Sequence, residues 1–138
     1  MPILSLDYGE KRVGVAVSDP ENRVALKRET IVYHNQEKLM QALGRICREE
    51  KIERIVIGLP VSLSGKDSRQ TKTVRDFAEY VKMKLNQDVV LEDERLTSKE
   101  AENSGASDLD SESARLILQT YLDKKSIDVI PDLIGDPD

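Results

Sequence analysis

The spacing of apolar residues changes once along this chain, and that change limits the folds it can form. Residues 13–18 alternate between valine and a small side chain, which is the two-residue period of a β-strand. After Asn35, apolar residues recur every three or four positions, in segments separated by short apolar runs. The sequence therefore predicts a group of strands followed by alternating helices and strands.

The first part of the chain predicts three strands joined by tight turns. The strands cover residues 3–7, 13–18 and 24–33, and the turns between them contain Gly9 and the pair Asp19–Pro20. Strands connected by such short turns pair with their neighbours in the antiparallel direction. We expect a three-stranded meander.

The rest of the chain predicts helices alternating with strands. Asn35 can cap a helix with Leu39, Leu43, Ile46 and Cys47 on one face. Residues 55–58 form an apolar strand that Pro60 ends, and residues 89–91 form a fifth strand after another helix. A short helix between Thr97 and Gly105 precedes a last helix over 109–125. This order predicts an α/β fold: a mixed five-stranded sheet with helices packed on both faces.

Length and composition fit one domain over residues 1–125, followed by an acidic, loosely ordered tail over 126–138. No apolar run has the roughly 18 residues needed to cross a bilayer, so we expect no membrane partner. One cysteine, Cys47, excludes an internal disulfide, and we expect a cytoplasmic protein. The net charge of −5 argues mildly against a protein that only coats nucleic acid.

Asp7 is the first candidate for a chemical role. It ends an apolar strand and is followed by Gly9, Lys11 and Arg12, so a rigid carboxylate would face a turn that a phosphate or an ion can approach. Aspartate is also a common turn residue, and the local sequence leaves both interpretations open.

Asp110 lies on the apolar side of the last predicted helix. It precedes Ala114 by four residues and Ile117 by seven, which places it on the stripe that faces the sheet. Asp108 and Glu112 are rotated about 200° away and are expected to face solvent. An inward carboxylate needs a compensating partner, although Asp110 could also serve as the helix cap.

A third acid follows the fifth predicted strand, where Asp93, Glu94 and Arg95 are adjacent. The pattern does not decide whether Asp93 or Glu94 points inward. If the strands are neighbours, these acids converge with Asp7 and Asp110 at one end of the sheet. Carboxylates gathered there require a cation, and Mg²⁺ or Mn²⁺ prefers such oxygen ligands. A site of this kind can cleave a phosphodiester.

Four motifs in order resemble the YqgF (RuvX) family. They lie at residues 7–19 (Asp-x-Gly-x-Lys-Arg-x-Gly-Val-Ala-x-Ser-Asp), 56–60 (Val-Ile-Gly-Leu-Pro), 93–97 (Asp-Glu-Arg-Leu-Thr) and 110–122. The resemblance spans residues 3 to about 124. Two positions depart from the family pattern: the loop after Pro60 reads Val-Ser-Leu-Ser-Gly, and Ser113 replaces a usual alanine.

The resemblance implies an RNase H-like fold related to the RuvC Holliday-junction resolvase. It implies a hydrolase, a nuclease that matures the 5′ end of pre-16S rRNA in ribosome biogenesis. It also implies that Asp7, Glu94 and Asp110 form the catalytic and metal-binding site, with Mg²⁺ or Mn²⁺ as cofactor and Asp93 as a further possible ligand.

Basic residues near these acids are candidates for nucleic-acid contacts. The positions are Lys11, Arg12, Lys66, Arg69, Lys72, Arg75 and Arg95. Four of them recur every three residues from Lys66 to Arg75, a run that could also be an ordinary solvated helix face. No aromatic stacking platform is evident, which favours recognition of the backbone and shape of a structured nucleic acid.

Other functions compete with pre-rRNA cleavage. A Holliday junction resolvase acting on branched DNA would use the same acids, but it usually needs a symmetric dimer. This sequence indicates a monomer or a weak homodimer. A non-catalytic RNA-binding factor in ribosome assembly would not need Asp7. An ATP-handling domain is disfavoured because the actin-like folds enclose nucleotide between two domains, and this chain is too short for that.

Overall fold

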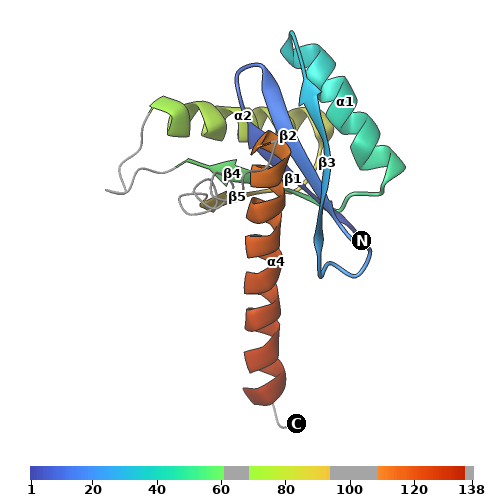
Figure 1. Ribbon diagram of the computed structural model, residues 1–138, viewed down its shortest axis with the longest axis vertical. Coiled ribbons are helices and arrows are strands. Elements are labelled where there is room, and N and C mark those ends of the chain that lie inside the picture. Colours follow the sequence, from blue (N-terminus) through green and yellow to red (C-terminus); the bar gives the residue numbers. More distant parts are fainter. Residues whose placement is uncertain (61–68, 94–108, 136–138) are drawn as a thin grey trace.

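The computed structural model (Figure 1) describes residues 1–60, 69–93 and 109–135, and the side chains of the last helix from residue 110 to 124. The strands are β1 (Ile3–Tyr8), β2 (Arg12–Ser18), β3 (Ala25–Val32), β4 (Arg54–Leu59) and β5 (Val89–Asp93). The helices are α1 (Gln36–Glu49), α2 (Arg69–Leu85) and α4 (Leu109–Gly135). The short helix predicted between Thr97 and Gly105 lies outside the described residues.

The five strands form one mixed sheet in the order β3-β2-β1-β4-β5. The first three strands pair as an antiparallel meander, and β4 and β5 add to β1 in the parallel direction. This is the mixed sheet that the sequence predicts. Strand β1 lies at the centre, with the antiparallel strands on one side and the parallel strands on the other.

Helices cover both faces of the sheet, as predicted. One face carries α1 and α2, whose apolar side chains pack with the valines of β2 and with Leu4, Leu6, Ile55 and Ile57 in the larger core cluster. The other face carries α4, which packs with Ile3, Ala16, Ala25 and Val56 in a second cluster. Cys47 is buried in the larger cluster, and this burial raises the pKa of its thiol to about 11.

Small residues line the α4 side of the central strands and let the helix approach closely. The Ser5 hydroxyl donates to the Ala114 carbonyl at 2.8 Å, and the Ser111 hydroxyl accepts from the Val15 N–H at 3.2 Å. The pairing of β2 with β3 shifts between Val13 and Val15, so the Val15 N–H at this irregularity bonds to the helix. The alternation in residues 13–18 thus separates a valine face, which packs under α1 and α2, from a face of small residues that contacts α4.

Two details of the last helix differ from the sequence-based expectation. The helix expected to end near Lys125 continues to Gly135. Residues 126–130 contain neither glycine nor proline, and each of them adds a hydrogen bond to an existing helix. Pro131 lies inside the last part of the helix and donates no backbone hydrogen bond. The division into a domain over 1–125 and a loosely ordered tail over 126–138 stays a prediction.

The expectation that Glu112 faces solvent is wrong. Only 9% of this residue is exposed, and its carboxylate bonds to Arg115 and lies 4.0 Å from Lys27 on β3. The helix rests on both β2 and β3, so it buries a wider sector than one apolar stripe. Asp108 lies outside the described residues.

Among the described residues, no helix has the length and apolar character needed to cross a membrane.

We predict that Gly14→Ala lowers the free energy of unfolding by about 3 kcal/mol, because overpacking a fitted interior costs this much. An added Cβ would lie 1.8 Å from the Asp110 carbonyl oxygen, and backbone on both sides leaves little room to adjust. Urea unfolding measures the change.

Gly44→Ala is the matched control, because its Cβ would meet only the mobile end of Arg48 at 3.3 Å and Leu85 at 3.5 Å. Replacing a glycine inside helix α1 should gain about 0.5–1 kcal/mol. Equal stability of the Gly14→Ala variant and the wild-type protein would contradict the close contact.

Candidate active site

Asp7 lies on the α4 side of the central strand, near its carboxyl end. Side chains alternate along β1: Ser5 bonds to α4, whereas Leu6 belongs to the cluster under α1 and α2. Asp7 therefore projects toward α4, and Tyr8 projects to the opposite face. In the antiparallel register Asp7 pairs with Gly14 of β2, and directly paired residues share a face of the sheet.

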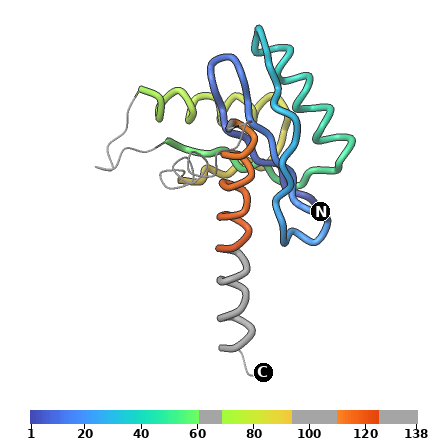
Figure 2. Tube along the Cα trace, viewed as in Figure 1, coloured from blue at the N-terminus to red at the C-terminus, as the bar shows by residue number. Residues whose placement is uncertain are grey.

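Gly14 brings the start of α4 against the sheet beside Asp7. The position that a Cβ would occupy on Gly14 is 1.8 Å from the Asp110 carbonyl oxygen and 2.8 Å from the Ser111 nitrogen. The backbone of the first turn of α4 thus occupies the space that the Cβ of any other residue at position 14 would fill. Figure 2 shows the blue β1–β2 hairpin beside the orange start of α4. The fold therefore gathers Asp7 and Asp110, two of the predicted catalytic acids.

Asp110 lies at the rim of this site, where it forms an ion pair with Arg12 of the β1–β2 hairpin. Its Oδ2 lies 3.1 Å from Arg12 Nε, and 35% of its side chain is exposed. A carboxylate in the first turn of a helix is also favoured by the helix dipole. Gly9, Glu10, Lys11, Arg12, Val32 and Asp110 line a hollow here. Lys11 and Arg12, both predicted to bind nucleic acid, thus lie beside Asp110.

The third predicted acid, Glu94, lies outside the described residues, and so do Lys66 and Arg95, two of the predicted nucleic-acid contacts. Asp93, the alternative acid, ends β5 opposite Leu59, whose side chain belongs to the core under α1 and α2. Paired residues share a face, so Asp93 projects away from the side where Asp7 lies. Within the described ranges, no group of three or more His, Cys, Asp or Glu residues could hold a metal ion.

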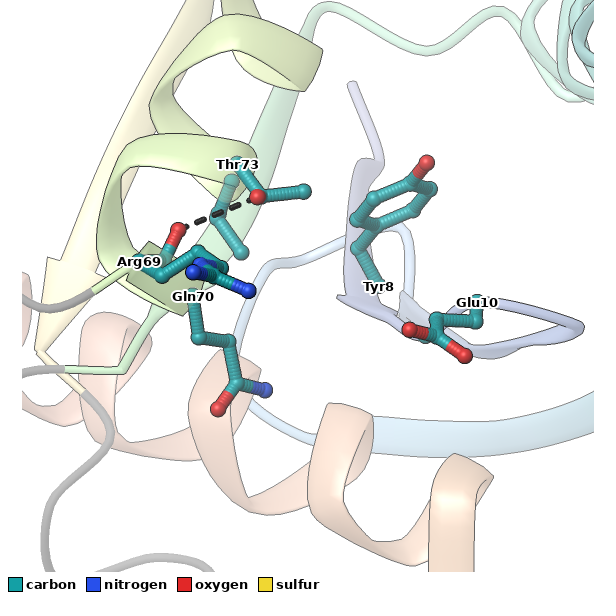
Figure 3. A pocket seen from close by; sticks show the side chains of 7 residues that line it. Tyr8, Glu10, Arg69, Gln70 and Thr73 are labelled. Atoms are coloured by element: carbon teal, nitrogen blue, oxygen red, sulfur yellow. Dashed lines mark hydrogen bonds between the residues drawn. The ribbon is translucent and has the colours of Figure 1, made fainter.

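The basic residues of α2 lie apart from the two acids. Arg69, Lys72 and Arg75 are all exposed on this helix, which covers the opposite face of the sheet. Lys72 pairs with Asp76 at 3.0 Å. Arg69 lines a pocket with Tyr8 and Glu10, between the start of α2 and the turn after β1 (Figure 3).

Sequence reasoning missed the residues that hold the two acids together. In the sequence Gly14 is one small residue of an alternating strand, although a glycine inside a strand often marks a close backbone approach. Ser111 was also missed; its hydroxyl lies 2.7 Å from that of Thr30 on β3 and accepts from Val15. Its neighbour Asp110 drew attention because it is charged, whereas nothing in the sequence distinguishes a serine that will bond to a strand.

The pair of acids fits a hard divalent cation. Carboxylate oxygens are the ligands that Mg²⁺ and Mn²⁺ prefer, and the two acids come from a strand end and a helix start that are held rigidly together. Arg12 already gives Asp110 one positive partner. Asp7 and Asp110 could therefore supply two metal ligands on the α4 side of the sheet.

Comparison with solved structures assigns the fold to the RNase H-like class of the RuvC resolvases. The chain is similar to Thermus thermophilus RuvC in complex with a Holliday junction substrate, with a TM-score of 0.62 and 11% identity over 91% of this chain and 96% of that one. It is also similar to the fowlpox virus Holliday junction resolvase, with a TM-score of 0.55 and 11% identity over 90% and 99% of the two chains. These likenesses show the fold.

The sequence belongs to the RuvX family. The family model, described as a Holliday junction resolvase, matches residues 1–124. A relative from Maridesulfovibrio salexigens is 39% identical over 88% of this chain and 98% of its own length. A second, from Sulfurihydrogenibium sp., is 41% identical over 90% and 91% of the two chains. Both carry the name "Putative pre-16S rRNA nuclease".

These comparisons confirm the fold and the family that the sequence indicated, and they support its assignment to the nucleases.

We predict that Glu112→Gln lowers the free energy of unfolding by about 1–3 kcal/mol at neutral pH, the usual cost of disrupting a buried charged hydrogen bond. The Arg115 guanidinium, with Lys27 nearby, holds the pKa of Glu112 below its ordinary value of 4.5. A lowered pKa contributes stability above that value, and the contribution is lost as the pH falls through the folded-state pKa.

The stability difference between variant and wild type should therefore narrow as the pH falls below 4.5, the ordinary pKa of a glutamate. Urea unfolding at several pH values measures it, with Asp123→Asn, on an exposed turn of the same helix, as control. A difference that stays constant across this range would show that Glu112 acts through packing alone.

Proposed function

We propose that this chain is a metal-dependent nuclease that hydrolyses phosphodiester bonds in precursor small-subunit rRNA. The observation that supports the chemistry is the meeting of Asp7 and Asp110 through the contact of α4 with Gly14. Two carboxylates near the exposed basic side chains of Lys11 and Arg12 suit a site that binds a cation and a phosphate together.

Each described residue of the site has a role in this proposal. Asp7 and Asp110 would hold Mg²⁺ or Mn²⁺, which when bound supplies a Lewis acid for the phosphodiester. The carboxylate of Asp7 comes from the central strand, where Asp7 pairs with Gly14 of β2 and directly follows Leu6, the last residue of β1 that pairs with β4. Arg12 balances the charge of Asp110, and together with Lys11 it offers a phosphate contact at the rim.

We assign the third ligand to Glu94 rather than to Asp93. The Asp-Glu-Arg-Leu-Thr motif at residues 93–97 resembles the family pattern in which the glutamate is catalytic. Asp93 ends β5 in register with Leu59 and therefore projects to the other face of the sheet from Asp7. Arg95 and Lys66 remain proposed phosphate contacts on the same grounds of sequence.

The relatives favour RNA as the substrate. Two of them, 39% and 41% identical along about nine tenths of this chain, are named for pre-16S rRNA. The family description and the RuvC structure instead name a Holliday junction, which makes a branched-DNA resolvase the second candidate. The same acids would serve either substrate. We further propose a cytoplasmic enzyme that acts as a monomer or a weak homodimer.

We predict that Asp7→Asn and Asp110→Asn each lower turnover about 10³-fold or more, because losing a metal ligand removes several kcal/mol of transition-state stabilisation. Cleavage of a labelled pre-16S rRNA fragment in Mg²⁺ or Mn²⁺ measures the effect. Asp123→Asn is the matched control: it makes the same chemical change on α4, where Asp123 is exposed and contacts Gln119.

A four-way DNA junction is incubated in parallel under the same conditions. Symmetric cleavage of the junction with untouched RNA would favour the resolvase instead. Full rRNA maturation by Asp7→Asn protein would instead identify a non-catalytic assembly factor.

EDTA should abolish cleavage by the wild-type protein, and added Mg²⁺ or Mn²⁺ should restore it, because the clustered carboxylates depend on a cation to act. Cleavage that continues in EDTA after dialysis would exclude the proposed metal dependence.

A further inference from the structure

Most of the few aromatic side chains gather on the face of the sheet opposite the two acids. The sequence has four tyrosines and one phenylalanine. The rings of Tyr8 and Phe77 stack with centroids 3.8 Å apart and planes 11° apart, and Tyr33 lies 6.3 Å from Tyr8 on a nearly parallel plane. Tyr80, one helical turn after Phe77, is half-buried beside them. The tertiary structure thus builds an aromatic cluster that the sequence did not reveal.

Two adjoining pockets open against this cluster and share Tyr8 and Thr73. We call them together the α2 groove; its wall consists of Tyr8, Gln36, Arg69, Thr73, Asp76, Phe77 and Tyr80, with Gly9, Glu10, Gln70 and Val74 at the Arg69 end. Figure 3 shows that end, where Arg69 and Thr73 of α2 stand across from Tyr8 and Glu10. The groove is aromatic at the Tyr80 end, where Lys84 Nζ lies 5.8 Å from the centroid of the Tyr80 ring. The other end carries the Arg69 guanidinium and the Glu10 carboxylate.

The wall of the groove also holds a polar atom without a partner. The Gln36 Nε2 group donates to the Tyr8 hydroxyl at 2.7 Å. Its Oε1 is buried and has no hydrogen-bond partner among the described residues. Turning the amide over would only exchange which atom is left unpaired. A buried amide atom without a partner destabilises the protein, so a ligand group that pairs with it after a rotation of the Gln36 side chain gains affinity.

We propose that the α2 groove binds an unpaired nucleobase of the nucleic-acid substrate. Bases stack on aromatic rings whatever their identity, and the edge of a base carries donors and acceptors that can pair with the Gln36 amide. Arg69 lies where it can contact the phosphate that follows the base. The inference rests on the proposed function for the identity of the ligand. The residues that form the groove are different from the acids of the proposed active site.

The position of Tyr8 connects the groove with the catalytic face. Tyr8 follows Asp7 directly at the end of β1, and the two side chains project to opposite faces of the sheet. A strand that passes the end of β1 can therefore place a phosphate near Asp7 and a neighbouring base in the groove. Such a path requires the nucleotide next to the cleaved bond to be unpaired, which would select single-stranded flanks or junction ends over continuous duplex.

Binding is tested in EDTA, where no cleavage occurs, by the fluorescence anisotropy of a labelled single-stranded oligoribonucleotide and of a blunt duplex of the same sequence. We expect Gln36→Leu and Tyr80→Ala each to weaken binding of the single strand about tenfold, since the first removes the partner of the base edge and the second removes a ring on which the base stacks. Duplex binding should be unchanged. Gln41→Leu, an exposed position on the same helix as Gln36, is the matched control.

The wild-type protein supplies a second measurement that does not depend on the stability of the variants. Addition of the single-stranded oligonucleotide should shift the amide NMR signals of Thr73 and Gln36 more than those of Gln41. Equal weakening of single-strand and duplex binding, or no shift at Thr73, would overturn the proposal. The proposal would also be overturned if a free mononucleotide saturated the groove while the affinity for the oligonucleotide stayed the same in the Gln36→Leu variant.

Cleavage in Mg²⁺ by the same preparations separates the two proposals. Binding in EDTA that depends on Gln36 and Tyr80 would support the groove even if Asp7→Asn left nuclease activity intact.

Discussion

The contact between Gly14 and the first turn of α4 determines the geometry on which the site depends. A strand residue without a side chain allows the helix backbone to reach the sheet, and an added Cβ would overlap the Asp110 carbonyl oxygen. Ser5 and Ser111 then fix the helix with hydrogen bonds to and from the backbone, at 2.8 and 3.2 Å. Because Asp7 is the partner of Gly14 across the β1–β2 ladder, the same contact brings the backbone at Asp110 next to the strand position of Asp7.

The sheet separates two tasks onto its two faces. On the α4 side, small residues replace bulky ones along β1 and β2, so the helix lies close and polar groups carry part of the contact. On the other side, valine, leucine and aromatic residues form the larger core under α1 and α2. Asp7 and Tyr8 are neighbours in sequence, yet they serve different faces, because side chains alternate along a strand. The acid that we propose as catalytic and the ring that we propose to bind a base therefore occupy consecutive positions.

The two acids in the first turn of α4, Glu112 and Asp110, have different charged surroundings. Glu112 is enclosed by Arg115 and Lys27, which satisfy it within the protein and hold its pKa low. Asp110, two residues earlier, is more exposed and has Arg12 at its rim. The inner acid is already neutralised by fixed partners, so it stabilises the fold. The outer acid remains accessible, which suits a group that exchanges one cationic partner for another during function.

The sequence by itself determined the succession of strands and helices along the chain, the mixed sheet and the family, because alternation, helical spacing and ordered motifs are local properties; the order of the strands within the sheet came from the tertiary structure. It also selected Asp7 and Asp110, since a charge at the end of a strand or on the inward side of a helix is visible in the pattern. It misjudged Glu112, because how wide a sector of a helix is buried depends on which strands it covers. The roles of Gly14, Ser111 and the aromatic cluster came only from the tertiary structure. Each depends on contacts between segments from tens of residues to about a hundred apart in the chain, and no local spacing specifies such contacts.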